Sequence, residues 1–210
     1  HIEAGFEALS RELASPFRQS TTTLSRLLAS DQLFTWAADC LAIAETTLPE
    51  SVGAAAECFR ATSEVAAILD ASRFLRWVQR GKALCRDAPD LATAYFRVSP
   101  RVLAMLPETM SDVWLEMGPG LYRREPESIA LASRFIAAMP DLLPLLSLVE
   151  LERLALLLNR LDETSHDLAT RCLASADSAF DDLADGLPDV FLSVALNLVR
   201  LNPVAAADFF

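Results

Sequence analysis

Large apolar residues recur along the chain at a period near 40 residues. Five leucines lie 41, 37, 40 and 37 residues apart, and a second large apolar residue follows each of them eight positions later. The pairs are Leu28 and Trp36, Leu69 and Trp77, Leu106 and Trp114, Leu146 and Leu154, and Leu183 and Phe191. A fixed period of this length predicts stacked helical hairpins.

A third position of the repeat is always alanine, and we expect it to lie where two helix backbones approach closely. The alanines are Ala14, Ala55, Ala92, Ala132, Ala169 and Ala205. Four residues later the chain is apolar in five of six units, as at Phe59, Phe96 and Ile136. The predicted core therefore includes Trp36, Phe59, Leu69, Trp77, Phe96, Leu106, Trp114, Ile136, Leu146, Leu154 and Leu183.

Prolines suggest how each unit divides into helices. In the clearest unit we predict three helices, from Ser72 to Arg86, from Pro89 to Val98 and from Pro100 to Leu106. Proline at a first helical position opens a helix, and Pro107 cannot continue one. Pro140 is the equivalent of Pro100 in a later unit. Three helices in about 40 residues are typical of the armadillo and HEAT class.

The stripe Trp77, Gly81 and Leu84 has i, i+4, i+7 spacing with a small middle residue, which predicts close packing of one helix on its neighbour. We therefore expect an all-α, armadillo/HEAT-like right-handed helical-repeat solenoid of about five units of roughly 40 residues. Residues 1–30 are expected to form an N-terminal helical cap or partial repeat. Residues 31–210 are expected to form a helical-repeat domain whose last unit is incomplete, as in a fragment of a longer protein.

Composition agrees with a helical chain that acts on proteins. Hydrophobic residues make up 52% of the sequence and there are only 6 glycines, which favours helix over strand. The longest uncharged apolar runs are too short to span a bilayer. A net charge of -11 and a pI near 4.6 oppose nucleic-acid binding. The 4 cysteines form no CxxC pair and no signal peptide is recognisable, so we expect buried reduced thiols in a cytoplasmic protein.

Asp181, Asp182 and Asp185 match the DDxxD pattern by which helical terpenoid enzymes hold magnesium through carboxylates. The alternative function is therefore a metal-dependent helical enzyme that uses these three residues. The repeat instead places Leu183 in the core and the acids at the end of a short helix, and no second metal-binding motif accompanies them. We interpret the segment as a solvated turn.

Two further patterns have a structural interpretation. Glu163 and His166 have the ExxH spacing of di-iron bundles, which need two such pairs, and they lie in a polar segment that predicts a loop and an N-cap. Gly118, Pro119 and Gly120 lack the GxxxxGK[ST] spacing of a phosphate loop, so a helix kink or end is expected. We predict no catalytic, cofactor-binding or metal-binding residue and no enzyme activity.

A basic strip stands out on this acidic chain. It consists of Arg73, Arg76, Arg80, Lys82 and Arg86, which recur at near-helical spacing. A solvated helix face is one interpretation, and a docking site for an acidic partner is the other, because opposed potentials speed and orient protein association. A HEAT-like nucleic-acid binder that uses this strip is a third interpretation, against which the net charge argues.

The recurring phrases resemble one known family. They are WVQRG at 77–81 and LATAYFRVSP at 91–100, echoed by WLEMG at 114–118 and LASRFIAAMP at 131–140. They resemble the helical repeats of von Willebrand factor A-containing proteins of the CbbO and NorD type, over roughly Leu24 to Phe210. The DxSxS metal site of the von Willebrand factor A domain is absent, so the resemblance covers the helical region alone and carries over no metal ligand.

The resemblance implies an adaptor that works with a MoxR-type AAA+ ATPase to remodel and activate a target enzyme, such as rubisco or nitric oxide reductase. The expected function is accordingly a non-catalytic protein-protein interaction scaffold without a cofactor. Its expected partners are the ATPase, the target enzyme, or another domain of the parent chain.

Overall fold

The computed structural model describes residues 11–45, 49–116, 122, 125–183 and 187–210. Within these ranges all regular structure is helical and no strand occurs. The predicted all-α class is confirmed.

The helices have lengths typical of hairpin repeats. In chain order they are α2 (Arg11–Leu24), α3 (Ser30–Glu45), α4 (Pro49–Ile68), α5 (Ala71–Asp87), α6 (Pro89–Met105), the 3-10 turn η1 (Glu108–Met110), α7 (Ser111–Glu116), α8 (Pro126–Leu142), α9 (Leu148–Thr164), α10 (His166–Asp181), α11 (Leu187–Leu201) and α12 (Pro203–Asp208). The predicted boundary after residue 30 falls at the beginning of α3.

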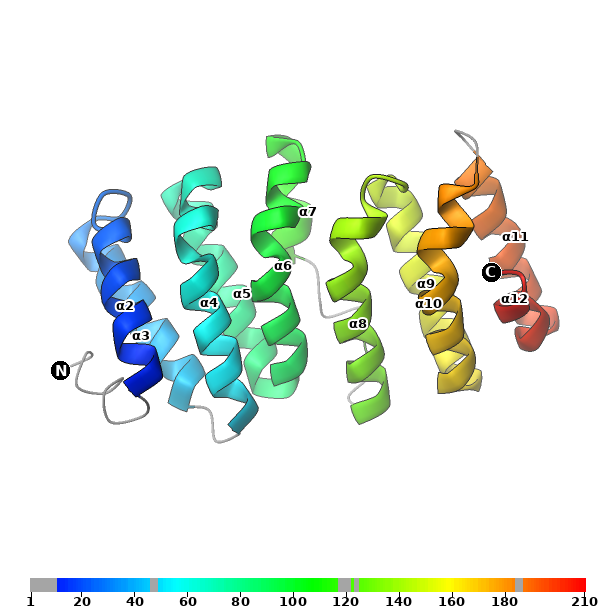
Figure 1. Ribbon diagram of the computed structural model, residues 1–210, viewed down its shortest axis with the longest axis horizontal. Helices are drawn as coiled ribbons and strands as arrows, with labels where there is room; N and C mark the ends of the chain where they lie inside the picture. The colour runs from blue at the N-terminus through cyan, green and yellow to red at the C-terminus, as the bar shows by residue number, and fades with distance from the viewer. Residues whose placement is uncertain (1–10, 46–48, 117–121, 123–124, 184–186) are drawn as a thin grey trace. The chain divides into compact units, whose positions relative to one another are not determined.

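The chain forms two compact units, residues 1–118 and residues 119–210. In the first unit α2, α4 and α6 pack side by side in one layer, whereas α3, α5 and α7 form a second layer (Figure 1). In the second unit α8, α10 and α12 form one layer, and α9 packs on α11 in the other. Within each unit, successive long helices therefore alternate between two layers.

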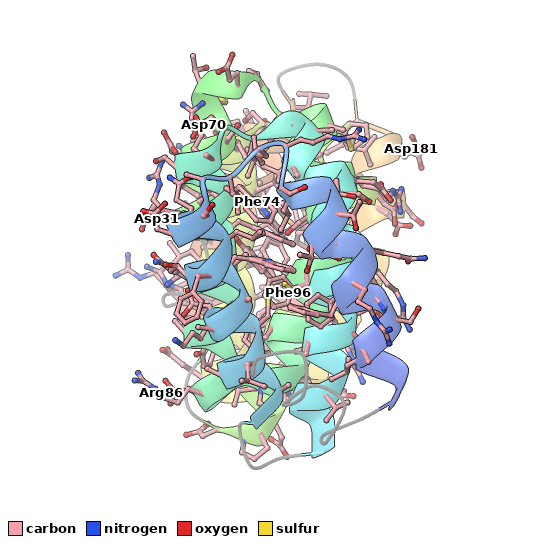
Figure 2. The ribbon with its side chains drawn as sticks, turned by 90° about the vertical axis from the view of Figure 1, so that its left-hand side faces the viewer. Asp31, Asp70, Phe74, Arg86, Phe96 and Asp181 are labelled. Carbon is pink, nitrogen blue, oxygen red and sulfur yellow. The ribbon has the colours of Figure 1, made fainter. Side chains whose placement is uncertain are left out.

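The core lies between the layers, as Figure 2 shows for Phe74 and Phe96. Nine of the eleven predicted core residues are buried, among them Trp36, Trp77 and Trp114 at 0% exposure. Leu106 and Leu183, which follow the ends of α6 and α10, are only half-buried. The repeated alanines Ala14, Ala55, Ala92, Ala132 and Ala169 are all buried, as expected, and Ala205 is half-buried.

The three-helix division of the unit is wrong, because α6 continues through Pro100 and α8 through Pro140. An interior proline removes one backbone hydrogen bond and clashes with the carbonyl four residues earlier, at a cost of about 3 kcal/mol. Burial of Val102 and Leu103, beyond Pro100 in the same helix, offsets this cost. Pro107 does stop the helix, since Leu106 before it is extended, with φ -82° and ψ 140°.

Candidate functional site

The basic side chains of the strip lie on two different flanks of α5. A helix advances about 100° per residue, so Arg73, Arg76 and Arg80 share one flank while Lys82 and Arg86 lie on another. The buried stripe, with Trp77 and Gly81, occupies the side facing the core. The strip is therefore two groups of side chains rather than one continuous surface.

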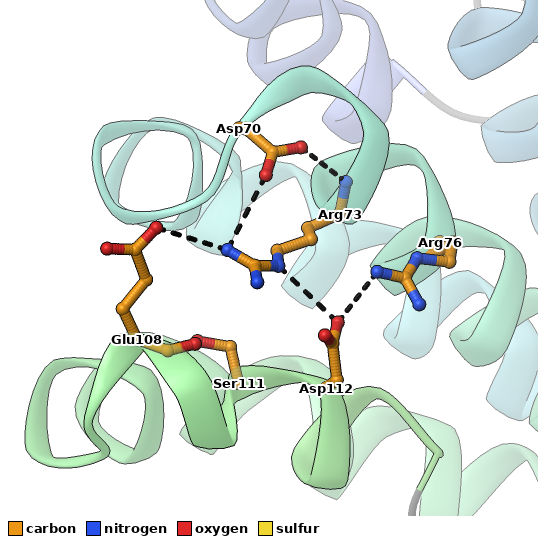
Figure 3. Close-up of polar contacts among 6 residues, drawn as sticks. All are labelled: Asp70, Arg73, Arg76, Glu108, Ser111 and Asp112. Carbon is orange, nitrogen blue, oxygen red and sulfur yellow. Dashed lines mark hydrogen bonds and ion pairs between the residues drawn. The ribbon is translucent and has the colours of Figure 1, made fainter.

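The first flank forms an ion-pair network with η1 and α7 (Figure 3). Arg73 Nη1 lies 3.2 Å from Glu108 Oε1, and Arg73 Nε lies 3.4 Å from Asp112 Oδ1. Arg76 Nη2 donates to the same Asp112 oxygen at 2.6 Å. The hydrogen bond to Asp112 raises the pKa of Arg73 above its usual value. Asp70 completes the network, because it caps α5 by accepting from the Arg73 backbone N–H at 2.9 Å.

The remaining cations contact α7, α3 or the end of α5 itself. Arg80 Nη2 donates to the Glu116 carbonyl oxygen at 2.7 Å, and a basic side chain there satisfies a carbonyl of the last helical turn. Lys82 Nζ donates to Asp39 Oδ1 on α3 at 2.7 Å. Arg86 makes only a loose pair with its neighbour Asp87, at 3.9 Å. Four of the five predicted docking residues thus hold α5 to the helices beside it.

The same ion pair occurs once in each compact unit, at equivalent positions of the repeat. Arg76 on α5 and Arg153 on α9 each directly precede the second recurring apolar position of the repeat, occupied by Trp77 and Leu154. Each pairs with an aspartate 36 residues later, Asp112 on α7 and Asp189 on α11 respectively. Each unit of the chain therefore contains a helix-to-helix contact with the same polar geometry.

We expect this contact to contribute little stability. In Asp189→Asn, the free energy of unfolding should fall by less than about 1 kcal/mol, because the pair is partly solvated, and the loss should shrink at high salt. Urea unfolding followed by circular dichroism measures it. Asp177→Asn, an exposed change in α10 of the same unit, is the control. A loss above about 2 kcal/mol that salt does not reduce would contradict a surface ion pair.

A groove between α3 and α5 borders the second flank. It has a volume of about 350 Å³ and is lined by Ala42, Gln79, Lys82, Ala83 and Arg86. We call this the α3–α5 groove. Ala42 and Ala83 contribute small side chains to its lining, and the Arg86 side chain is 79% exposed and points outward (Figure 2). The groove thus combines a hollow with two cations at one place on an acidic chain.

A buried hydroxyl that the sequence analysis did not single out joins α5, α6 and α7. The Ser99 Oγ accepts from Trp77 Nε1 at 2.9 Å and from Trp114 Nε1 at 3.1 Å, and it donates to the Tyr95 carbonyl at 2.6 Å. All three hydrogen-bonding positions of the hydroxyl are occupied. The Tyr95 ring also stacks on Trp114, with centroids 5.2 Å apart. Ser99 therefore links two equivalent tryptophans of successive repeats.

Ser99→Ala should lower the free energy of unfolding by about 2 kcal/mol, because it leaves two buried indole N–H groups without an acceptor. Ser133→Ala is the control, since the Ser133 hydroxyl donates only to the Ile129 carbonyl of its own helix. We expect the control to stay within about 0.5 kcal/mol. Equal effects of the two changes in urea unfolding would contradict the linking role of Ser99.

The thiols are buried, as predicted. All 4 cysteines are free and buried, and Cys40 Sγ lies 4.0 Å from Cys58 Sγ. Burial raises the pKa of Cys40, and it raises the pKa of Cys85 and of Cys172 to about 12. A thiol that stays protonated at neutral pH is a weak nucleophile and a weak metal ligand.

The described residues of the predicted acidic and histidine patterns lie at opposite ends of α10. Asp181 and Asp182 are exposed at the end of α10, and Asp185 lies outside the described residues. His166 begins α10, where its Nδ1 lies 2.9 Å from Asp162 Oδ1 and its Nε2 lies 3.4 Å from Thr170 Oγ1. In the described ranges no three His, Cys, Asp or Glu side chains gather as metal ligands would.

Gly118, Pro119 and Gly120 lie outside the part of the chain that the structure describes. None of the helices described here combines the length and apolar character required to cross a membrane. Comparison of the chain with family models, curated proteins and solved structures finds no match.

Proposed function

We propose that this chain is a non-catalytic protein-interaction scaffold of the armadillo/HEAT type, which docks an acidic segment of a partner protein in the α3–α5 groove. The observation that carries the proposal is the groove itself. Two cations border a hollow of about 350 Å³ that is lined otherwise by Ala42, Gln79 and Ala83. Small side chains let a partner approach closely, and the cations select a carboxylate.

The charge distribution favours an acidic partner at this place. The chain as a whole carries a net charge of -11, so an acidic protein is repelled by most of its surface. Arg86 extends from α5 with its side chain 79% exposed, and its pairing with Asp87 at 3.9 Å is loose. A partner carboxylate can therefore bind its guanidinium through paired hydrogen bonds. Attraction at the groove, together with repulsion from the rest of the acidic surface, determines where the acidic partner binds.

In this proposal the other cations of the strip have a supporting role. Arg73, Arg76 and Arg80 bind η1 and α7, and Lys82 of α5 binds Asp39 of α3. These contacts hold α3, α5 and α7 beside one another, so the groove is formed before a partner arrives. A preformed site loses less conformational entropy on binding. Of the five predicted docking residues, Arg86 then contacts the partner directly, whereas Lys82 lines the same groove while paired with Asp39.

The resemblance to CbbO and NorD type repeats supplies the partner class. We propose that the chain is the helical region of an adaptor that links a MoxR-type AAA+ ATPase to the enzyme it activates. Alternation of helices between two layers in each unit supports a solenoid, and stacked hairpins offer the extended surface that such an adaptor needs.

The test measures binding of the purified chain to a MoxR-type ATPase of its source organism by isothermal titration calorimetry. Reversing both groove charges with Lys82→Glu and Arg86→Glu should weaken binding roughly tenfold, and raised salt should weaken wild-type binding. Arg60→Glu is the matched control, because Arg60 is 67% exposed on α4 in the other layer.

The outcomes separate the two parts of the proposal. Equal weakening by Arg60→Glu and by the groove variant would exclude the α3–α5 groove as the docking site. Wild-type chain that binds the target enzyme or another domain of the parent protein, but not the ATPase, would retain the scaffold function and reject the ATPase as its direct partner.

A further inference from the structure

Three cysteines from three successive helices lie near one another in the core of the first unit. Cys40 of α3, Cys58 of α4 and Cys85 of α5 are each 0% exposed. The thiols of Cys40 and Cys58 are in direct contact, with 4.0 Å between their Sγ atoms. Cys85 is near enough to interact electrostatically with both. The core of this unit therefore contains one contacting pair of thiols and a third thiol beside it.

The contact between thiols is not a general property of the repeat. Cys40 lies four residues after the recurring tryptophan, where the following repeat has Gly81. Cys58 lies three residues after the recurring alanine, where the following repeat has Tyr95. The same two core positions thus accept side chains of different size and chemistry. Two sulfur atoms in contact are a feature of the hairpin formed by α3 and α4.

The contact between Cys40 and Cys58 is short enough for a disulfide to form with little movement. A disulfide joins two sulfurs at about 2.05 Å, so the two Sγ atoms must approach each other by about 2 Å. Rotation about the Cα–Cβ bonds moves the sulfurs while the helix backbones stay in place. Because α3 and α4 pack directly on each other, such a bond would cross-link one hairpin.

We propose that Cys40 and Cys58 are a redox-sensitive pair, which a low-molecular-weight disulfide such as oxidised glutathione converts to an intramolecular disulfide that locks α3 on α4. One thiolate of the pair attacks a sulfur of oxidised glutathione, forms a mixed disulfide and releases one glutathione thiolate. The other thiolate then attacks the protein sulfur of the mixed disulfide and releases the second. Two protons and two electrons pass from the two cysteines to glutathione.

Burial determines when the pair reacts. Both thiols are 0% exposed, and burial raises the pKa of Cys40, so the packed core keeps the pair protonated and away from an oxidant. Local separation of α3 from α4 hydrates the thiols, and it costs less free energy than global unfolding. We therefore expect oxidation to become faster in urea at concentrations below the unfolding transition.

The disulfide should stabilise the first unit. It closes a loop over residues 41–57 and so restricts the unfolded chain, which raises the free energy of the unfolded state. All three tryptophans lie in the first unit, so their fluorescence during urea unfolding follows this effect. The oxidised chain should unfold at a higher urea concentration than the reduced chain.

The test incubates the reduced chain with oxidised glutathione in urea below the transition and then counts thiols in the denatured protein. Wild type should lose two of its four thiols, and mass spectrometry should find Cys40 linked to Cys58. Cys85→Ala with Cys172→Ala retains the pair and should lose both of its thiols to one intramolecular disulfide. Cys40→Ala with Cys172→Ala is the matched control, because it retains Cys58 and Cys85 and should form no intramolecular disulfide.

Three results would overturn the proposal. One is a wild-type chain that keeps all four thiols at every urea concentration below the transition. Another is a disulfide that joins Cys58 to Cys85 as fast in the control variant as Cys40 joins Cys58 in the pair variant. The third is an oxidised wild-type chain whose fluorescence midpoint in urea is no higher than that of the reduced chain.

Discussion

Gly81→Ala should lower the free energy of unfolding by about 3 kcal/mol, although alanine is the better helix former by about 1 kcal/mol. Gly81 lies in the middle of α5 and is buried. A Cβ at this position would lie 2.5 Å from Phe96 Cε1 and nearer still to Cζ. The methyl group therefore occupies space that the phenyl ring fills.

The Phe96 ring has no room to move away. It is 0% exposed, and its centroid lies 5.0 Å from that of Trp77 and 5.7 Å from that of Tyr95. A well-packed core relieves such an overlap only by shifting backbone or forcing strained rotamers. Urea unfolding followed by circular dichroism measures the loss.

Gly53→Ala is the matched control, because Gly53 is an exposed helical glycine of α4 whose added Cβ would lie 3.9 Å from Thr93 Oγ1. It should stabilise the chain by about 0.5 to 1 kcal/mol. Combining Gly81→Ala with Phe96→Leu should cost less than the sum of the single changes, since the smaller side chain makes room. A loss below about 1 kcal/mol for Gly81→Ala would contradict the close approach of α5 and α6.

Trp77→Ala should lower the free energy of unfolding by roughly 3 to 5 kcal/mol, as truncation of buried aromatic residues does. The indole is 0% exposed and packs on Phe74 and Phe96 at centroid distances of 5.5 and 5.0 Å. It also donates to Ser99, so both packing and a buried hydrogen bond disappear. Circular dichroism during urea unfolding gives the change in stability.

The control for Trp77→Ala is Phe34→Ala, which truncates a 65% exposed aromatic residue of α3 in the same layer. At low protein concentration it should change stability by no more than about 0.5 kcal/mol. Similar losses for the two variants, or a loss below about 1 kcal/mol for Trp77→Ala, would mean that the repeat alignment places Trp77 wrongly.

The repeat period made much of the core predictable from sequence. Trp36, Trp77 and Trp114 occupy the same position of the repeat, so the sequence alone predicts that all three are buried, as they are. The small middle residue at Gly81 likewise indicated a close helix contact, and Phe96 proves to be that contact. Pro100 was misread because a local rule, that proline opens helices, competes with burial of the apolar residues beyond it.

The candidate site was harder to predict, because the geometry of its side chains depends on partners in other repeats of the sequence. Arg76 and Lys82 looked like one strip in sequence, yet they bind Asp112 on α7 and Asp39 on α3. The spacing of 36 residues between opposite charges could have revealed the first partner once the repeat was aligned. No local sequence pattern around Ser99 predicts that its hydroxyl accepts hydrogen bonds from two indoles.

The three tryptophans of the chain all lie in the first compact unit, at positions 36, 77 and 114. Tryptophan fluorescence, excited selectively over that of tyrosine, therefore reports the environment of that unit alone, whereas circular dichroism sums the helices of both. Fluorescence and dichroism curves that coincide would mean that residues 1–118 and 119–210 melt in one cooperative transition, and curves that separate would assign a distinct midpoint to each. The three tryptophans thus serve as a natural probe of whether the two compact units unfold cooperatively.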